Sequence, residues 1–375
     1  MIYLDNAGTT RVLGEIAETY KYFLTEEYYN PSAPYHQALE LSKAITNAKE
    51  NILRLIKGNG NIIFTSSGTE SDNLALFGTK KPNGCRIIVS NSEHSAIYNT
   101  ALELKQRGYD VVFTEADKFG RVDIEQFQKN MNKDTYLVSI MHVNNETGAI
   151  NDIKKLCEIA KKINPKVIFH SDGVQALGKI KVSVSDIGLD LYSFSGHKIH
   201  APKGVGGLFV KSNINLKPML FGGGQENNLR SSTENVAGIM CLTQALQLAI
   251  NNIEDNYQKV NSLCDIIKAK IDNNKIMTIT NNDCSPYILC LALKHIRGEV
   301  MLHSLEKYGI LIGTGSACSS KKSHKKLPSI LKLPSEYSEG IIRISFCRYN
   351  TKDDIEYFIN KLNLEYSELI KYVRG

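Results

Sequence analysis

A lysine in a short polar segment is the sharpest sign of chemistry in this sequence. Lys198 ends the segment Ser195-Gly196-His197-Lys198, which follows an apolar run. A lysine in a Gly-containing turn, beside Ser and His, can form a Schiff base with a carbonyl compound. A lone loop lysine is usually solvated, but this one follows a predicted strand, where an α/β fold binds its ligand.

Two further segments follow predicted strands. Asp172 comes directly after the apolar run 167–171 and could hold a cationic ring nitrogen, although a helix N-cap or surface acid is an equally good interpretation. The segment 66–71, Ser-Ser-Gly-Thr-Glu-Ser, leads into an apolar-periodic helix whose free N–H groups suit a phosphate. A plain N-cap is the alternative there. No Walker-A lysine follows, which argues against a nucleotide P-loop.

One cysteine stands apart from the rest. Cys318 lies in the segment 313–320, Gly-Thr-Gly-Ser-Ala-Cys-Ser-Ser, and a cysteine in such a loop is a candidate reactive thiol, with a tolerated surface cysteine as the alternative. No two of the eight cysteines have the two-residue spacing of a zinc or redox motif. Most of the others are expected to be buried, as for Cys157 on the apolar face of a helix over 153–163. Cys347 is the one candidate for a backup thiol, and a buried strand position is expected for it.

The elements that must position these residues alternate between strands and helices. Short β-branched or aromatic runs predict strands at 62–65, 86–90, 110–114, 136–141, 167–171 and 189–194, with helix-length segments between them. This alternation predicts an α/β fold with a mostly parallel sheet. Helices over about 235–275, and strands at 288–293 and 341–345, predict a smaller α+β domain. The expected limits are 15–255 for the large domain, and 1–14 with 256–375 for the small one.

Composition is that of a globular enzyme. The chain has 375 residues, a formal net charge of +6 and 42% hydrophobic residues. Its first residues are neither basic nor followed by an apolar run, and no apolar stretch is long enough for a membrane span, so we expect a cytoplasmic protein. We expect neither a membrane nor a direct nucleic-acid partner.

A set of motifs, taken together, resembles one family. In order along the chain they are Thr-Ser-Ser-Gly-Thr-Glu-Ser-Asp-Asn at 65–73, Ser-Glu-His at 92–94, Met-His-Val-Asn-Asn-Glu at 141–146, Ser-Phe-Ser-Gly-His-Lys at 193–198 and Gly-Ser-Ala-Cys at 315–318. The chain resembles group I cysteine desulfurases of the NifS/IscS type, within the class V aminotransferases. The resemblance runs from residue 3 to about 372 and implies the fold-type I architecture of pyridoxal 5′-phosphate (PLP) enzymes.

The resemblance implies a role for each matching residue. Lys198 would bind the cofactor covalently, Asp172 would pair with its pyridinium nitrogen, and Gln175 would hydrogen-bond its phenolic oxygen. His94 would stack on the ring and transfer protons, although a satisfied core histidine is the commoner fate of a lone His. The implied phosphate ligands are Thr69, Ser195 and His197, with Thr233 from a partner subunit, and Gly68 is a further implied cofactor-binding residue. Asn145 and Arg343 would hold the substrate carboxylate, and Asn145 would also contact the cofactor. For Arg343 the alternative is a surface ion pair.

The implied reaction converts L-cysteine to L-alanine. Lys198 removes the α-proton, and the Cys318 thiolate attacks the substrate sulfur to leave a persulfide for a sulfur-acceptor protein. The implied assembly is a homodimer. The acceptor stays open between iron–sulfur cluster assembly, tRNA thiolation and a selenium pathway.

Departures from the family pattern bear on partners more than on chemistry. Asn227 and Asn228 stand where basic residues are frequent, Ser232 replaces a glycine, and the chain ends without the longer tail of scaffold-binding relatives. A selenocysteine lyase is the main alternative. A transaminase is disfavoured by Cys318, and a sulfur carrier without catalysis is disfavoured by the retained Lys198 and Asp172.

Overall fold

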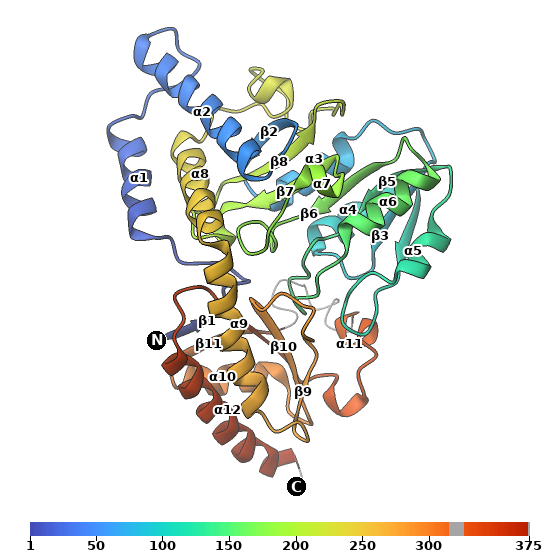
Figure 1. The fold of residues 1–375 in the computed structure, drawn as a ribbon, viewed down its shortest axis with the longest axis vertical. Coiled ribbons are helices and arrows are strands. Elements are labelled where there is room, and N and C mark those ends of the chain that lie inside the picture. Colours follow the sequence, from blue (N-terminus) through green and yellow to red (C-terminus); the bar gives the residue numbers. More distant parts are fainter. Residues whose placement is uncertain (315–325, 374–375) are drawn as a thin grey trace.

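The computed structural model describes residues 1–314 and 326–373 and contains two β-sheets (Figure 1). The larger sheet has the strand order β2-β8-β7-β6-β5-β3-β4. These strands are β2 (Gly60–Thr65), β3 (Arg86–Ser90), β4 (Asp110–Thr114), β5 (Thr135–Ser139), β6 (Ile168–Asp172), β7 (Leu191–Ser195) and β8 (Gly206–Lys211). Pairs from β7 through β4 are parallel, and β8 is antiparallel to both neighbours. The mostly parallel sheet predicted from the sequence is confirmed.

Helices occur between most of these strands along the described chain. Their bounds are α1 (Gly14–Thr25), α2 (His36–Leu55), α3 (Gly68–Gly78), α4 (Ser95–Gln106), α5 (Ile124–Asn130), α6 (Ile153–Ile163), α7 (Val184–Ile187), α8 (Val236–Asn251), α9 (Ile253–Lys270), α10 (Gly298–Glu306), α11 (Lys326–Ile330) and α12 (Lys352–Val373). Single 3₁₀ turns occur at η1 (Gly196–Lys198), η2 (Glu226–Asn228) and η3 (Ser335–Tyr337).

Alternate residues of the large sheet face two different cores. In β2, Ile62 and Phe64 belong to one core and Ile63 to the other, as expected for side chains that alternate along a strand. The first core packs against α1, α2, α5, α6 and α8, and the second against α3 and α4. Both faces are covered, which explains why apolar side chains occur on both faces of these strands.

The smaller sheet has the order β1-β11-β12-β10-β9. Its strands are β1 (Ile2–Leu4), β9 (Ile276–Thr278), β10 (Ile288–Leu293), β11 (Ile310–Thr314) and β12 (Ile341–Ser345). The N-terminal strand pairs in parallel with β11, so the chain start belongs to this sheet. Figure 1 shows α9 running from the end of α8 down beside the small sheet. The domain limits stay a prediction, and α9 runs across residue 255.

The strands predicted at eight positions are all present within two residues of the expected ends. The antiparallel strand β8 was missed. It opens with two glycines, and at Gly206 a Cβ would lie 2.7 Å from the carbonyl carbon of Ser67. The glycine is therefore needed where the strand passes close to the loop before α3. Because glycine replaces a β-branched or aromatic residue there, the sequence lacks the pattern that predicts a strand.

The cysteines of the described residues are free thiols. Cys157 is buried in the core on α6, as predicted. Cys318 lies outside the described residues. No single described helix is long and apolar enough to span a bilayer. The helices α8 and α9 together have the required length and apolar composition, but they are bent by 73° where they meet.

Candidate active site

The sequence-predicted residues gather where the parallel strands of the large sheet end. Asp172 is the last residue of β6, Ser195 is the last residue of β7, and Lys198 ends the turn η1 that follows. His94 and Gly68 stand at the starts of α4 and α3. This is the edge at which open α/β sheets bind ligands.

Asp172 is a buried carboxylate among cationic neighbours. Its side chain is held by the backbone N–H of Val174, which donates to Oδ1 over 2.8 Å. Burial raises the pKa of Asp172, while His94 and Lys198 act in the opposite direction. A buried carboxylate of this kind needs a cation or donor to stay ionised. The interpretation of Asp172 as a surface acid is wrong, because only 5% of it is exposed.

A second buried carboxyl lies behind Asp172. Asp72 of α3 is 1% exposed, and burial together with the charge of Asp172 raises its pKa well above the usual range. His170 packs against it, with 3.7 Å between Nε2 and the Asp72 carboxylate, and hydrogen-bonds Ser139 and Ser193. Repulsion between the two carboxyls favours one ionised group, so Asp72 keeps its proton more readily than Asp172.

The amine of Lys198 is held by backbone carbonyls. Its Nζ donates to the oxygens of Ala7 and Gly8, each over 2.6 Å. These carbonyls belong to the segment that follows β1, which itself is anchored to η1 where Thr10 donates to the carbonyl of His197 over 2.9 Å. The chain start therefore reaches from the small sheet to the turn that carries the reactive lysine.

Gln175 lies against the same segment. Its Nε2 donates to the Ala7 carbonyl over 2.9 Å, and its Oε1 accepts from the Nζ of Lys179 over 2.6 Å. The carboxamide is 4% exposed. Gln175 and Lys198 thus share one backbone acceptor, which brings the two predicted cofactor ligands together.

His94 caps α4 and is neutral at physiological pH. Its Nδ1 accepts from the backbone N–H of Ala96 over 3.2 Å, so the neutral ring carries its proton on Nε2. Burial lowers the pKa of His94; the charge of Asp172 raises it, and those of Lys198 and Arg343 lower it further. His94 therefore interacts electrostatically with Asp172 and Lys198 and also with Arg343.

The predicted phosphate ligands surround the start of α3. A Cβ on Gly68 would lie 2.7 Å from Cγ2 of Val174 and 3.5 Å from Cβ of Ser195. The glycine therefore keeps open the space between the start of α3, Val174 and Ser195. The Oγ of Ser195 is buried without a hydrogen-bond partner among the described residues. Ser67 does cap α3, since its Oγ accepts from the Glu70 N–H over 3.1 Å. The N-cap interpretation is therefore correct, and it leaves the helix start available to an anion.

The other two phosphate candidates differ in exposure. His197 hydrogen-bonds Thr9 with 3.1 Å between Nδ1 and Oγ1, and burial beside Lys198 lowers its pKa to about 4, so its ring is neutral. Thr69 is exposed and lines a cavity of about 410 Å³ between the start of α3 and the segments around Leu220 and Arg230.

These features fit PLP. The buried Asp172 suits a ring N–H⁺, the amine of Lys198 is next to it, and the unpartnered Ser195 hydroxyl lies at a helix start that favours phosphate. The space beside Gly68, at the same helix start, has no room for a larger side chain at position 68.

The substrate-side residues come from the small sheet and a loop. Arg343 of β12 is 6% exposed; its Nη1 donates to the carbonyl of Asn145 over 2.8 Å and its Nη2 to Oδ1 of Asp5 over 2.8 Å. Its Nε has no partner among the described residues. The alternative of a surface ion pair is correct in that Arg343 pairs with a carboxylate, and wrong in that Arg343 is buried. Asn145 contacts Arg343 through its backbone.

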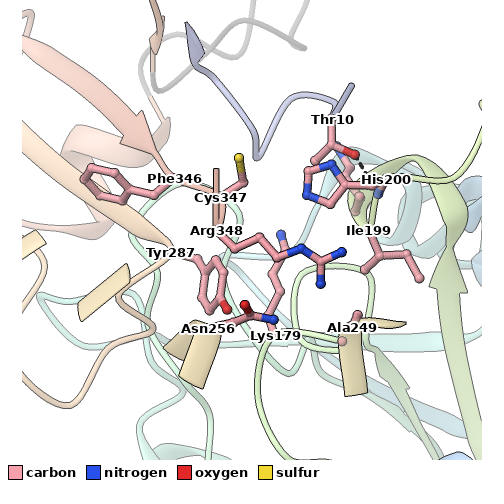
Figure 2. A pocket seen from close by; sticks show the side chains of 12 residues that line it. Thr10, Lys179, Ile199, His200, Ala249, Asn256, Tyr287, Phe346, Cys347 and Arg348 are labelled. Carbon is pink, nitrogen blue, oxygen red and sulfur yellow. Dashed lines mark hydrogen bonds between the residues drawn. The ribbon is translucent and has the colours of Figure 1, made fainter. Parts of the chain in front are cut away.

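Of the predicted residues that the structure describes, Thr233 stands apart from this group, exposed in the segment before α8. Cys318 is among the residues that the structure does not describe. Cys347 was expected in a buried strand, and that expectation is wrong: β12 ends at Ser345, and Cys347 is half-buried. It lines a small cavity of about 30 Å³ together with Lys179 and Lys198 (Figure 2).

Sequence reasoning missed the chain start as part of the site. Asp5, Ala7, Gly8, Thr9 and Thr10 all contact predicted site residues. A run of small and polar residues directly after an apolar triplet was the available signal. It resembles the segments that follow β6 and β7.

Comparison with known proteins gives consistent results. Residues 2–358 match the model of the aminotransferase class-V family. A "Cysteine desulfurase IscS" of Dictyoglomus turgidum is 38% identical over 371 residues, which cover 96% of this chain and 93% of that protein. A "NifS/IcsS protein homolog" of Lactobacillus delbrueckii subsp. bulgaricus is 37% identical over 99% of this chain and 98% of its own length.

Solved structures agree with these relatives. A NifS-like protein superposes with a TM-score of 0.91 at 32% identity and covers 98% of this chain and 99% of that chain. The structure of SspA in complex with cysteine has a TM-score of 0.81 at 27% identity, over 94% of this chain and 100% of that chain.

Proposed function

The chain belongs to the class-V aminotransferase family and is a PLP-dependent cysteine desulfurase of fold-type I, and we propose that it converts L-cysteine to L-alanine through Lys198, His94, Arg343 and Cys318. The observation that carries this assignment of roles is the meeting of Lys198, Asp172 and His94 at one sheet edge, where each affects the charge of another. The cysteine bound to the related SspA supports L-cysteine as the substrate.

Cofactor binding is assigned to residues of the large sheet. Asp172 holds the ring nitrogen, Gln175 the phenolic oxygen, and Gly68, Thr69, Ser195 and His197 the phosphate. When bound, PLP supplies an electron sink for the pair left on the substrate α-carbon after proton removal. Asp172 serves this chemistry by keeping a positive charge on the ring nitrogen, which its burial strengthens.

Proton transfer falls to Lys198 and His94. The Lys198 amine would take the proton from the substrate α-carbon, and the carbonyls of Ala7 and Gly8 lie within reach of the ammonium that forms. His94 is neutral with a proton on Nε2, so it can deliver that proton and regain one at the same atom.

Substrate binding is assigned to Arg343 and Asn145. A guanidinium matches a carboxylate with two parallel N–H donors, and the unpartnered Nε of Arg343 supplies one of them. Its Nη2 is paired with Asp5, so a substrate carboxylate would share or replace that contact.

Sulfur capture is assigned to Cys318. Its thiolate forms an S–S bond with the substrate sulfur while the substrate C–S bond breaks, and the electron pair of that bond stays with carbon, which is protonated to alanine. The enzyme keeps one extra sulfur as a persulfide and needs no external oxidant. An acceptor protein then takes the sulfur; whether it serves iron–sulfur assembly or tRNA thiolation stays a prediction. The free thiols of the described chain fit a reducing compartment, which supports a cytoplasmic location.

A homodimer with shared sites is part of the proposal. Thr233 is exposed, and the preceding loop presents the apolar side chains Met219, Leu220 and Phe221, the last 84% exposed. Apolar groups gathered in this way favour an interface. Mixing Lys198→Ala and Thr233→Ala subunits, each inactive alone, should restore partial turnover, because one site of the mixed dimer is intact. A fully active monomer in dilute solution would exclude shared sites.

The test of the function compares two substrates. Purified holoprotein should release alanine and persulfide sulfur from L-cysteine in equal amounts. Alanine release from L-selenocysteine alone would favour the selenocysteine lyase, an alternative that the desulfurase names of the relatives do not favour.

A further inference from the structure

Lys179 is a buried cation that the proposed reaction does not use. It follows Gly178 in the turn after β6, and only 6% of the residue is exposed. None of the salt bridges between described residues includes it. Burying an ammonium group without a carboxylate partner is costly, so a structural role alone explains Lys179 poorly.

A short chain of hydrogen bonds connects Lys179 with the reactive lysine. The Nζ of Lys179 donates to Oε1 of Gln175 over 2.6 Å, and Nε2 of Gln175 donates to the carbonyl of Ala7 over 2.9 Å. The Nζ of Lys198 donates to that same carbonyl over 2.6 Å. Both lysines also line the small cavity in which Figure 2 shows Lys179 beside Arg348 and Cys347.

The contacts with Lys179 and with the Ala7 carbonyl together fix which way the Gln175 carboxamide faces. An ammonium group can only donate, so it selects the amide oxygen and directs the amide nitrogen to the opposite side. Without Lys179, only the bond to the Ala7 carbonyl would oppose a half-turn of the amide that presents its oxygen instead. An oxygen there would repel an anionic ligand oxygen, whereas the N–H group binds it.

We propose that Lys179 is a positioning residue of the desulfurase: it turns the Gln175 N–H toward the phenolic oxygen of bound PLP, and its charge stabilises the phenolate form of that oxygen. The inference rests on the proposed role of Gln175 as the ligand of that oxygen. Lys179 itself touches neither the substrate nor the reacting atoms.

The surroundings of Lys179 are cationic. Burial and the charges of Lys198 and Arg343 lower its pKa to about 7. The titratable and charged groups that face it are Lys198, Arg343, His197, His200, Arg348, Tyr287 and Cys347. No carboxylate of the described chain is among them, and an anionic phenolate would supply the missing counter-charge.

The test titrates the near-visible absorbance of the lysine-bound cofactor with pH. Lys179→Met keeps the length of the side chain but removes the charge and the donor. A nearby cation favours the deprotonated form of the Lys198–cofactor link, so the midpoint of this titration should rise by about one pH unit in Lys179→Met. In Lys179→Arg, which keeps the charge and a donor, the midpoint should return most of the way to the wild-type value. The kcat for cysteine should fall about tenfold with little change in KM.

Two further variants complete the design. Lys181→Met removes an exposed lysine of the same segment, one that pairs with Glu254, and should titrate like the wild type. Lys179→Gln keeps a donor for Gln175 without the charge, and it carries the same test if Lys179→Met does not fold. A Lys179→Met or Lys179→Gln holoprotein that titrates like Lys181→Met would overturn the proposal. The titration needs no substrate, so a wild type that releases no alanine from cysteine would refute the function independently.

Discussion

The cofactor side of the site consists of Asp172, Ser195, Lys198 and His94, which all follow or end strands of one sheet, whereas the substrate side brings together residues from opposite ends of the chain. Asp172 and Ser195 end the adjacent strands β6 and β7. On the substrate side, Arg343 pairs with Asp5, which is 338 positions away. The cofactor side is therefore built on the large sheet, and the chain start adds the carbonyls of Ala7 and Gly8 that accept from Lys198. The substrate side, in contrast, takes Asp5 from the chain start and Arg343 from the small sheet.

This difference predicts that the two sides can be damaged separately. Changes on the cofactor side should remove both the bound-cofactor spectrum and turnover, because every later step needs that group. Changes on the substrate side should leave the spectrum intact and weaken binding of cysteine.

The largest effect is expected for Lys198→Ala. It removes the amine that binds PLP and takes the substrate proton, so turnover should fall by about 10³-fold or more. The near-visible band of the lysine-bound cofactor should disappear. Absorbance and borohydride trapping check this, and a variant that still traps PLP on a lysine would mean that another amine, such as Lys179, is the true attachment site.

Cys318→Ser should separate the chemistry of the cofactor from the capture of sulfur. A serine hydroxyl stays protonated at neutral pH and cannot hold transferred sulfur, so persulfide and sulfide output should fall to background while the cofactor spectrum stays. Mass spectrometry of wild type after a cysteine pulse should find one extra sulfur atom on Cys318.

Cys347→Ser is the matched control. Burial raises the pKa of the Cys347 thiol, which keeps it protonated and a poor nucleophile, so this variant should retain sulfur output. An extra sulfur atom on Cys347 with Cys318 unmodified would refute the assignment of the sulfur-capturing residue.

Arg343→Lys addresses the substrate side. A lysine keeps the charge but loses the paired donors, so kcat/KM for cysteine should fall about 10- to 100-fold, mainly through KM. The cofactor spectrum should be unchanged. Asp5→Asn leaves the guanidinium in place and should change KM less; a spectrum lost in Arg343→Lys would show that the two sides are not independent.

The contrast between the two sides also explains what could be predicted from the sequence. The strands and the residues that follow them were found because each motif is local: an apolar run, then a turn with Asp172 or Lys198. The parallel sheet alone then brings these motifs together. The strand β8 was missed because its glycines serve a close approach to Ser67, which a pattern of side chains cannot reveal.

The long-range contacts could not be predicted in the same way. The carbonyls of Ala7 and Gly8 hold Lys198 through backbone atoms, which carry no sequence signal. Residues 1–14 were predicted to belong with the small domain, but the Arg343–Asp5 pair depends on β1 pairing with β11, and a three-residue strand gives too short a pattern to predict that pairing. Lys179 and His170 were missed because burial, not residue type, sets them apart.

The smallest effect concerns acid stability, and it should belong to the cofactor side. His170 is fully buried between Ser139 and Ser193, and burial lowers its pKa to about 3. The unfolded chain has a histidine pKa of about 6.5. Between these values the unfolded state binds a proton that the folded state does not, so the free energy of unfolding should decrease as pH falls from about 6.5 toward 3, by at most about 1.4 kcal/mol per pH unit for this group.

His170→Asn should flatten that dependence, although the lost hydrogen bond also costs about 1 kcal/mol at neutral pH. Urea unfolding of the holoprotein at pH 7 and at pH 5 measures both effects. His142, whose pKa burial lowers to about 4, contributes over the same range, so some slope should remain in the variant. Arg343→Lys retains the wild-type histidines and should keep the full slope. If His170→Asn instead keeps the wild-type slope while Arg343→Lys loses it, the acid-labile contacts lie at the junction of the two sheets rather than behind Asp172.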